Sequence, residues 1–175
     1  ATGETGNIVI GQDAMSSAVE GASGTVDNNI AIGTNALYGG TMSSTNALKE
    51  NIAIGKNAIG NTGTNPQTGI VAIGYLALEN LTSGTENTAI GYQSMNETTL
   101  GGYNTAIGYN SMAQDAGLAN TYNTFMGRNS GGGDWTTGAC SHNTGVGANS
   151  MVGAMNDSDF NTGVGSHCLE ALTTG

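Results

Sequence analysis

Four side chains in the last third of this 175-residue chain are of types that bind zinc. They are Cys140, His142, His167 and Cys168. Thiolate and imidazole groups are common zinc ligands, but a C-x-H…H-C spacing is not that of a standard zinc finger. Cys168 and His167 also stand in columns of a repeat, described below, that elsewhere hold small and polar residues. We therefore interpret them as a small core residue and a polar substitution, and predict no metal site.

Groupings suited to catalysis are absent from the sequence. No Ser is paired with a recurring His and acid, as nucleophilic hydrolysis requires. No pair of carboxylates repeats, as glycoside hydrolysis would require. The glycine-rich segment SGGGDW at 130–135 lacks the Lys of a phosphate-binding loop. We predict that the chain is not an enzyme and needs no cofactor.

Aromatic side chains are the best candidates for binding. Tyr75, Tyr92 and Tyr109 occupy one column of the repeat. Outward rings would form a strip that stacks on sugars, whereas the alternative, which we favour, is that they pack against each other and the loops. Trp135, after three glycines, is either an exposed saccharide platform or a filler for a core left open by Gly131. These four aromatic residues form the predicted saccharide site.

Threonine forms a column of its own in the second half of the chain. An outward, flat ladder of threonines would suggest ice binding. Earlier copies of the repeat have Ile in this column, which argues that it faces inward, so we do not favour ice. The residues are Thr88, Thr105, Thr124, Thr144 and Thr162.

Composition limits the classes of protein and partner. Charged residues make up 9%, against about 25% in an ordinary globular protein, and there are 30 glycines and one proline. The net charge is −10, with only three basic residues, so clustered cations for nucleic acid or an anionic membrane surface are missing. No apolar run approaches the ~20 residues of a membrane helix, and no signal-like segment is visible.

A repeat accounts for the unusual composition. The motif reads Asn, then Thr or Ile, a small residue, Ile or Val, and Gly, as in NTAIGYQSM and NTAIGYNSM. Its glycines are spaced 17 to 22 residues apart, and nine copies fill residues 1–175 as a single domain. The first position is Ile in one copy, Ile70, and otherwise Asn7, Asn29, Asn51, Asn87, Asn104, Asn123, Asn143 and Asn161.

The period of the repeat predicts an all-β fold. It is too short for most helical repeats, and glycine recurs in every unit, which disfavours helix. We predict a parallel β-solenoid of nine rungs of 17–22 residues, stacked about 4.8 Å apart, with amide ladders of Asn and a core of Ile and Met columns. Alternation along the strand places positions two and four, such as Ile30 and Ile32, in the core. The third position, mainly Ala, then faces out.

The predicted core of one chain is thin. Each rung offers about four apolar side chains, and ordering its backbone costs more than ~1 kcal/mol per residue. We therefore predict a homo-oligomer, with three-fold symmetry, that buries the small-residue face. The C-terminal EALTTG and N-terminal ATGETG would join into a linker of the usual length. We expect a segment of a longer array, or one able to stack end to end.

The motif also resembles two known groups of repeats. NTAIGYNSM, NTAIGYQSM and NIAIGKNAI are similar to the N-(S/T)-x-A-I-G repeats of trimeric autotransporter adhesin heads, and to NTAIGY-NAL arrays of bacteriophage tail-fibre proteins. The resemblance implies a left-handed, homotrimeric β-roll or β-helix that serves as a host-attachment fibre.

The predicted function follows from this resemblance. We expect a non-enzymatic segment of a tail fibre or surface adhesin, extracellular or on a virion surface, that presents a host-recognition surface to a glycan or protein. Its partners would be copies of itself, without nucleic acid or membrane insertion. The alternative is a self-assembling extracellular filament with a purely structural role. Glycosylation sequons occur at Asn80, Asn96 and Asn156.

Overall fold

A computed structural model gives the fold and describes residues 5–16, 25–39, 47–63, 65–114, 117–135 and 137–173. Every regular element in this part of the chain is a short β-strand. The larger sheet contains β1 (Ile8–Ile10), β3 (Ile30–Ile32), β5 (Ile52–Ile54), β7 (Val71–Ile73), β9 (Thr88–Ile90), β10 (Thr105–Ile107), β11 (Thr124–Met126), β12 (Thr144–Val146) and β13 (Thr162–Val164). The smaller sheet contains β2 (Thr25–Asp27), β4 (Ala47–Lys49), β6 (Gln67–Thr68) and β8 (Gly84–Thr85).

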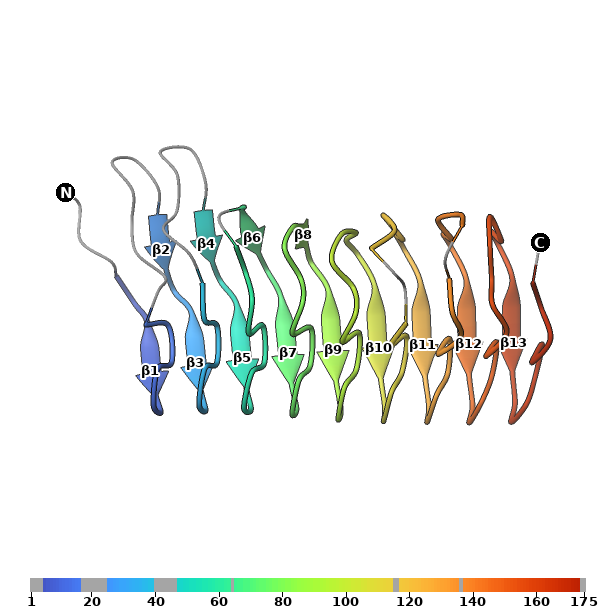
Figure 1. The fold of residues 1–175 in the computed structure, drawn as a ribbon, viewed down its shortest axis with the longest axis horizontal. Helices are drawn as coiled ribbons and strands as arrows, with labels where there is room; N and C mark the ends of the chain where they lie inside the picture. The colour runs from blue at the N-terminus through green and yellow to red at the C-terminus, as the bar shows by residue number, and fades with distance from the viewer. Residues whose placement is uncertain are drawn as a thin grey trace.

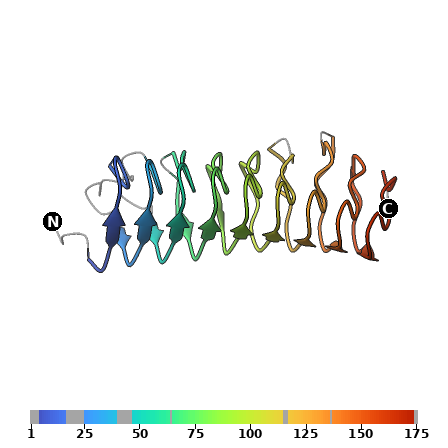
Figure 2. The ribbon, with the colours of Figure 1, turned by 90° about the horizontal axis from the view of Figure 1, so that it is seen from below.

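Both sheets are parallel, and their strands follow one another in chain order. Each strand of the nine-stranded sheet comes from one copy of the motif and pairs with the next copy in register, so that Thr105 lies opposite Thr88 and Thr124. The coils form a straight row from one end of the molecule to the other (Figures 1 and 2). The predicted all-β parallel β-solenoid is confirmed.

A buried ladder of asparagines runs beside the large sheet. Asn123 donates both its backbone N–H (3.0 Å) and its side-chain Nδ2 (3.1 Å) to Asn104 Oδ1, and its Nδ2 also donates to the carbonyl of Cys140. The same pattern joins Asn7, Asn29 and Asn51 at one end, and Asn123, Asn143 and Asn161 at the other. The predicted amide ladder is confirmed; it is interrupted at Ile70, which contributes only its backbone N–H.

Asn104→Ala should destabilise the fold strongly. The change removes the acceptor that Asn104 Oδ1 offers to the backbone N–H and Nδ2 of Asn123, and it leaves the carbonyl of Asn120 without its donor, in a buried site. Asn87 Oδ1 loses one of its two donors and keeps the backbone N–H of residue 104. Each unpaired buried group costs ~1–3 kcal/mol, so we expect a loss of about 3 kcal/mol or more in urea unfolding. The matched variant Asn61→Ala, at an exposed position, should change stability by less than ~0.5 kcal/mol. Equal losses in the two variants would contradict the role of the ladder.

The prediction of which strand face is buried is wrong. Ala31, Ala53, Ala72, Ala89 and Ala106, at the third position of the motif, are fully buried. The second and fourth positions point outward and are half-buried or exposed. The core is therefore narrow and lies between the alanine column and a buried column after the turn, which consists of Met15, Leu37, Ile59, Leu78, Met95, Met112 and Met151.

Hydrogen bonds across the coil explain the reversal. Ser94 Oγ donates to the carbonyl of Ala106 at 2.9 Å, and Ser111 Oγ donates to the carbonyl of Phe125 at 3.0 Å. Ser130 and Ser150 reach Gly145 and Gly163 in the same way. In these four copies a serine hydroxyl spans from the turn to the strand backbone, and in earlier copies the buried small residues Ala36, Ala58 and Ala77 occupy the same column, so no space remains for Ile between them. Isoleucine has to point away from the coil.

Candidate functional site

The outer face of the nine-stranded sheet carries two straight columns of side chains. The first column contains Ile8, Ile30, Ile52, Val71, Thr88, Thr105, Thr124, Thr144 and Thr162. The second contains Ile10, Ile32, Ile54, Ile73, Ile90, Ile107, Met126, Val146 and Val164. We call these two columns the outward face. It follows from in-register parallel pairing, which stacks like residues at every strand.

The second column of the outward face is apolar, and the face is most exposed at its two end strands. Ile8 and Ile10 are 51% and 58% exposed, and Val164 is 68% exposed. The strands between these ends shield one another and are mostly half-buried. The threonine column, predicted to face inward, lies on this face instead, for the same reason that displaces isoleucine from the core. The argument against ice binding from an inward-facing column is therefore wrong.

Three tyrosines form a stacked ladder at the end of the strands. The ring centroids of Tyr75 and Tyr92 are 5.1 Å apart and those of Tyr92 and Tyr109 are 5.3 Å apart. The guanidinium carbon of Arg128 lies 5.9 Å from the Tyr109 centroid. The rings are outward, at 40–47% exposure, and they also pack against each other. Because their faces cover one another, the ladder offers ring edges and hydroxyls to a ligand.

A second aromatic ladder was not predicted. Tyr103, Tyr122, His142 and Phe160 stack with centroid separations of 4.9, 5.0 and 4.8 Å. They stand directly before the motif asparagine in four successive copies, a column that alignment of the repeats contains. Tyr103 precedes β10 and Tyr109 follows it, so one aromatic ladder runs along the side of the outward face where the strands begin and the other along the side where they end.

Trp135 is fully buried, so the expectation that it is an exposed platform is wrong. Its ring packs edge-on against Phe125, with centroids 5.6 Å apart. Phe125 replaces the usual alanine of the strand, and a Cβ on Gly131 or Gly145 would lie 2.6 Å from the Phe125 ring. The alternative interpretation, in which tryptophan fills the core near Gly131, agrees with these contacts.

The four Cys and His side chains that could bind zinc by type make different contacts in the structure. His142 belongs to the second aromatic ladder, and His167 Nδ1 pairs with Glu170 at 3.0 Å. Cys140 is a buried free thiol whose pKa is raised, chiefly by burial, and Cys168 is free and half-buried. In the described part of the chain, no group of three or more His, Cys, Asp or Glu side chains could hold a metal ion.

The fold defines the class of this protein, a parallel β-solenoid repeat protein. Comparison with protein-family models, with curated proteins and with solved structures finds no match for the chain. Among the described residues, none belongs to a helix long and apolar enough to cross a membrane.

Proposed function

We propose that the chain is a rigid segment of a homotrimeric adhesion fibre, such as a tail fibre or surface adhesin. In this proposal three copies of a left-handed solenoid of nine rungs pack through their outward faces. The rod serves outside the cell or on a virion, has no catalytic role, and displays its remaining surface to a host glycan or protein. The feature that carries the proposal is the uncovered outward face.

The pattern of the two columns supports burial of this face. The second column is apolar in all nine strands, whereas the first changes from Ile and Val to Thr after Val71. A sheet face in contact with water normally carries polar side chains, and large exposed apolar patches mark interaction sites. The second column therefore fits the centre of an interface and the first column its flank.

The same pattern supports a parallel arrangement of copies. The Ile-only end of the outward face lies at β1 to β5 and the Thr-containing end at β9 to β13. A rotation axis along the rod keeps equal heights together, so Ile meets Ile and Thr meets Thr. Closed rotational symmetry of this kind leaves no copy with an uncovered outward face. The number three comes from the resemblance to trimeric fibre repeats.

The oligomeric state of the chain tests the proposal. Native mass spectrometry and analytical ultracentrifugation at micromolar concentration should give three times the chain mass of 17.4 kDa. A folded monomer over the whole concentration range would overturn it. Electron microscopy should show discrete rods, and concentration-dependent polymers would instead favour the filament alternative.

A further inference from the structure

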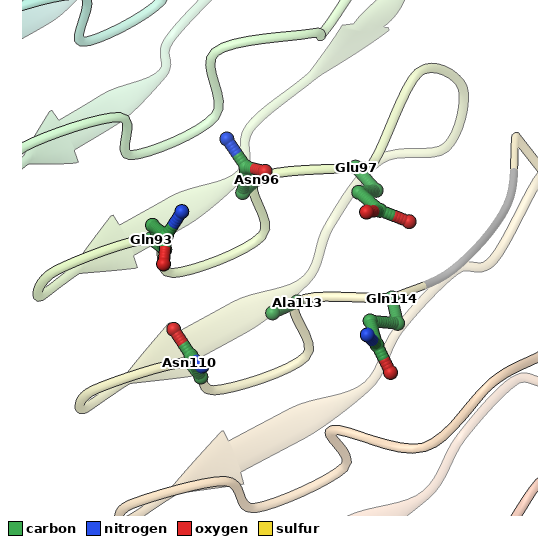
Figure 3. Close-up of a pocket in the computed structure, with 6 residues that line it drawn as sticks. All are labelled: Gln93, Asn96, Glu97, Asn110, Ala113 and Gln114. Carbon is green, nitrogen blue, oxygen red and sulfur yellow. The ribbon is translucent and has the colours of Figure 1, made fainter.

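A small polar pocket lies between two neighbouring coils, away from the outward face. Gln93, Asn96 and Glu97 line it from one coil, and Asn110, Ala113 and Gln114 from the next (Figure 3). Its volume is about 100 Å³, roughly that of three waters. The lining residues belong to the turns that follow β9 and β10 and to the return segments after them. They do not belong to the strands.

The backbone holds the two walls of this pocket at fixed positions. Gln93 N donates to the carbonyl of Tyr75 and Asn110 N donates to that of Tyr92, each at 2.9 Å. On the return segments, Glu97 N donates to the carbonyl of Ala113 at 3.2 Å. The lining side chains are therefore presented by a rigid ladder, and a ligand need not order the backbone in order to bind.

Side-chain hydrogen bonds join polar residues of neighbouring turns along the solenoid, and this ladder lacks a bond at the pocket. On one side Asn35 Nδ2 donates to Asn57 Oδ1 at 3.2 Å. On the other side Asn129 Nδ2 donates to Asn149 Oδ1 at 3.3 Å. At the equivalent place in the pocket, Asn110 Oδ1 is buried without a hydrogen-bond partner. The wall of the pocket therefore contains hydrogen-bonding capacity that the protein does not use.

The lining chemistry defines the class of ligand. Four side-chain amides line the pocket, and Asn96 Nδ2 already donates to the carbonyl of Leu76 and to Glu79 Oε2. The other three amides supply donors and acceptors, and the exposed Glu97 carboxylate supplies a strong acceptor. Adjacent hydroxyls of a sugar, each able to donate and accept, match this set. Tyr92 and Tyr109 directly precede Gln93 and Asn110, so tyrosine hydroxyls and ring edges lie on the same turns.

Other ligand classes fit the pocket less well. Among the described lining residues none is basic, which disfavours phosphate, sulfate or acidic sugars, and Ala113 is the one apolar residue, which disfavours a hydrophobic ligand. Calcium requires six to eight oxygen ligands and usually several carboxylates, whereas the described lining residues supply one.

We propose that this pocket binds the hydroxyl-bearing edge of a neutral sugar. The inference rests on the proposed function, because it names the ligand class of the host-recognition surface. Assembly through the outward face leaves the turns and return segments on the outside, so each rod presents the pocket once per chain. Weak binding at each pocket then gains strength from several attachments on one rod.

Saturation-transfer NMR and calorimetry with glucose, galactose, mannose and N-acetylglucosamine test the pocket. We expect saturable binding of at least one of these sugars. The double variant Glu97→Gln/Gln114→Ala removes one charged and one neutral hydrogen-bonding group at exposed positions, and affinity should fall at least ~10-fold. The control Glu50→Gln/Gln12→Ala makes the same chemical changes at exposed positions far along the chain and should bind as the unmodified protein does.

Three results would overturn the pocket assignment. They are no binding of any of the four sugars, equal binding by the pocket variant and the control, or binding that disappears on addition of EDTA, which would indicate a metal site. The oligomeric state is measured on the same samples. A trimer that binds no sugar refutes the pocket alone, whereas a monomer refutes the proposed fibre.

Discussion

Gly108→Ala is expected to prevent folding or to lower stability by more than ~3 kcal/mol. Gly108 follows β10 at φ +139°, a conformation that side chains other than glycine rarely adopt. A Cβ there would lie 2.4 Å from the carbonyl oxygen of Gly127 and 2.7 Å from its carbonyl carbon, both backbone atoms. Neither can move without separating two coils. The cost of the backbone strain and the cost of the steric overlap therefore add. Folded proteins in general are stable by only ~5–15 kcal/mol.

Gly63→Ala is the matched control for this prediction. Gly63 also has a positive φ, +62°, but a Cβ at this position would meet no atom within 4 Å. Only the left-handed backbone then opposes alanine, which costs ~1–2 kcal/mol. Urea unfolding followed by circular dichroism measures both variants. Similar midpoints for the two would show that contact between stacked glycines is not what restricts position 108.

The positions of the strands and their register could be predicted from the sequence because a glycine marks the turn in each copy of the motif. In the nine-stranded sheet, the glycine after each strand recurs at the same place in the motif, and asparagine precedes each strand but one, so the register of parallel pairing follows from alignment of the copies. Ile70 shows why the alignment tolerates an exception. Its backbone N–H still donates to Asn51 Oδ1, and the next link of the ladder begins at Asn87.

Which face of each strand is buried could not be predicted from the sequence in the same way. Alternation separates two faces, but it does not say how far away the opposite wall of the coil lies. In a wide coil Ile30 and Ile32 would fill the core, whereas the distance spanned by Ser94 Oγ makes this coil narrow and puts Ala106 inside. Hydrophobicity ranks Ile above Ala, so a rule based on residue type alone selects the wrong face.

Compensating changes in side-chain size within the core could be predicted in part from the sequence. Gly131 breaks the column of Met and Leu in the copy where Phe125 replaces Ala, and this pairing of a large and a small residue indicates compensation. The sequence did not show that Trp135 packs on Phe125 rather than facing solvent, because the loop between Gly131 and Trp135 has no counterpart in other copies. The second aromatic ladder, by contrast, could have been found by aligning the residue before the motif asparagine.

The double variant Ile32→Glu/Ile54→Glu is expected to convert the proposed trimer into monomers at micromolar concentration. Both residues belong to the second column of the outward face and are half-buried in one chain. In an assembly along a rotation axis, the variant would bring together carboxylates from every copy in an apolar interface. Buried unpaired charges cost several kcal/mol each, and like charges repel, so association should weaken by several orders of magnitude. Sedimentation velocity should show roughly a threefold fall in mass.

The fold of the single chain should survive this change, since the outward side chains do not reach its core. Circular dichroism should therefore keep the β-sheet spectrum while the mass falls. Leu100→Glu/Asn61→Glu adds the same two charges at exposed positions outside the outward face and should leave the assembly intact. If the Ile variant unfolds, Ile32→Thr/Ile54→Thr introduces the residue found in the adjacent column and should weaken assembly without charge. An unchanged mass in both Ile variants would mean that the outward face is not where the copies meet.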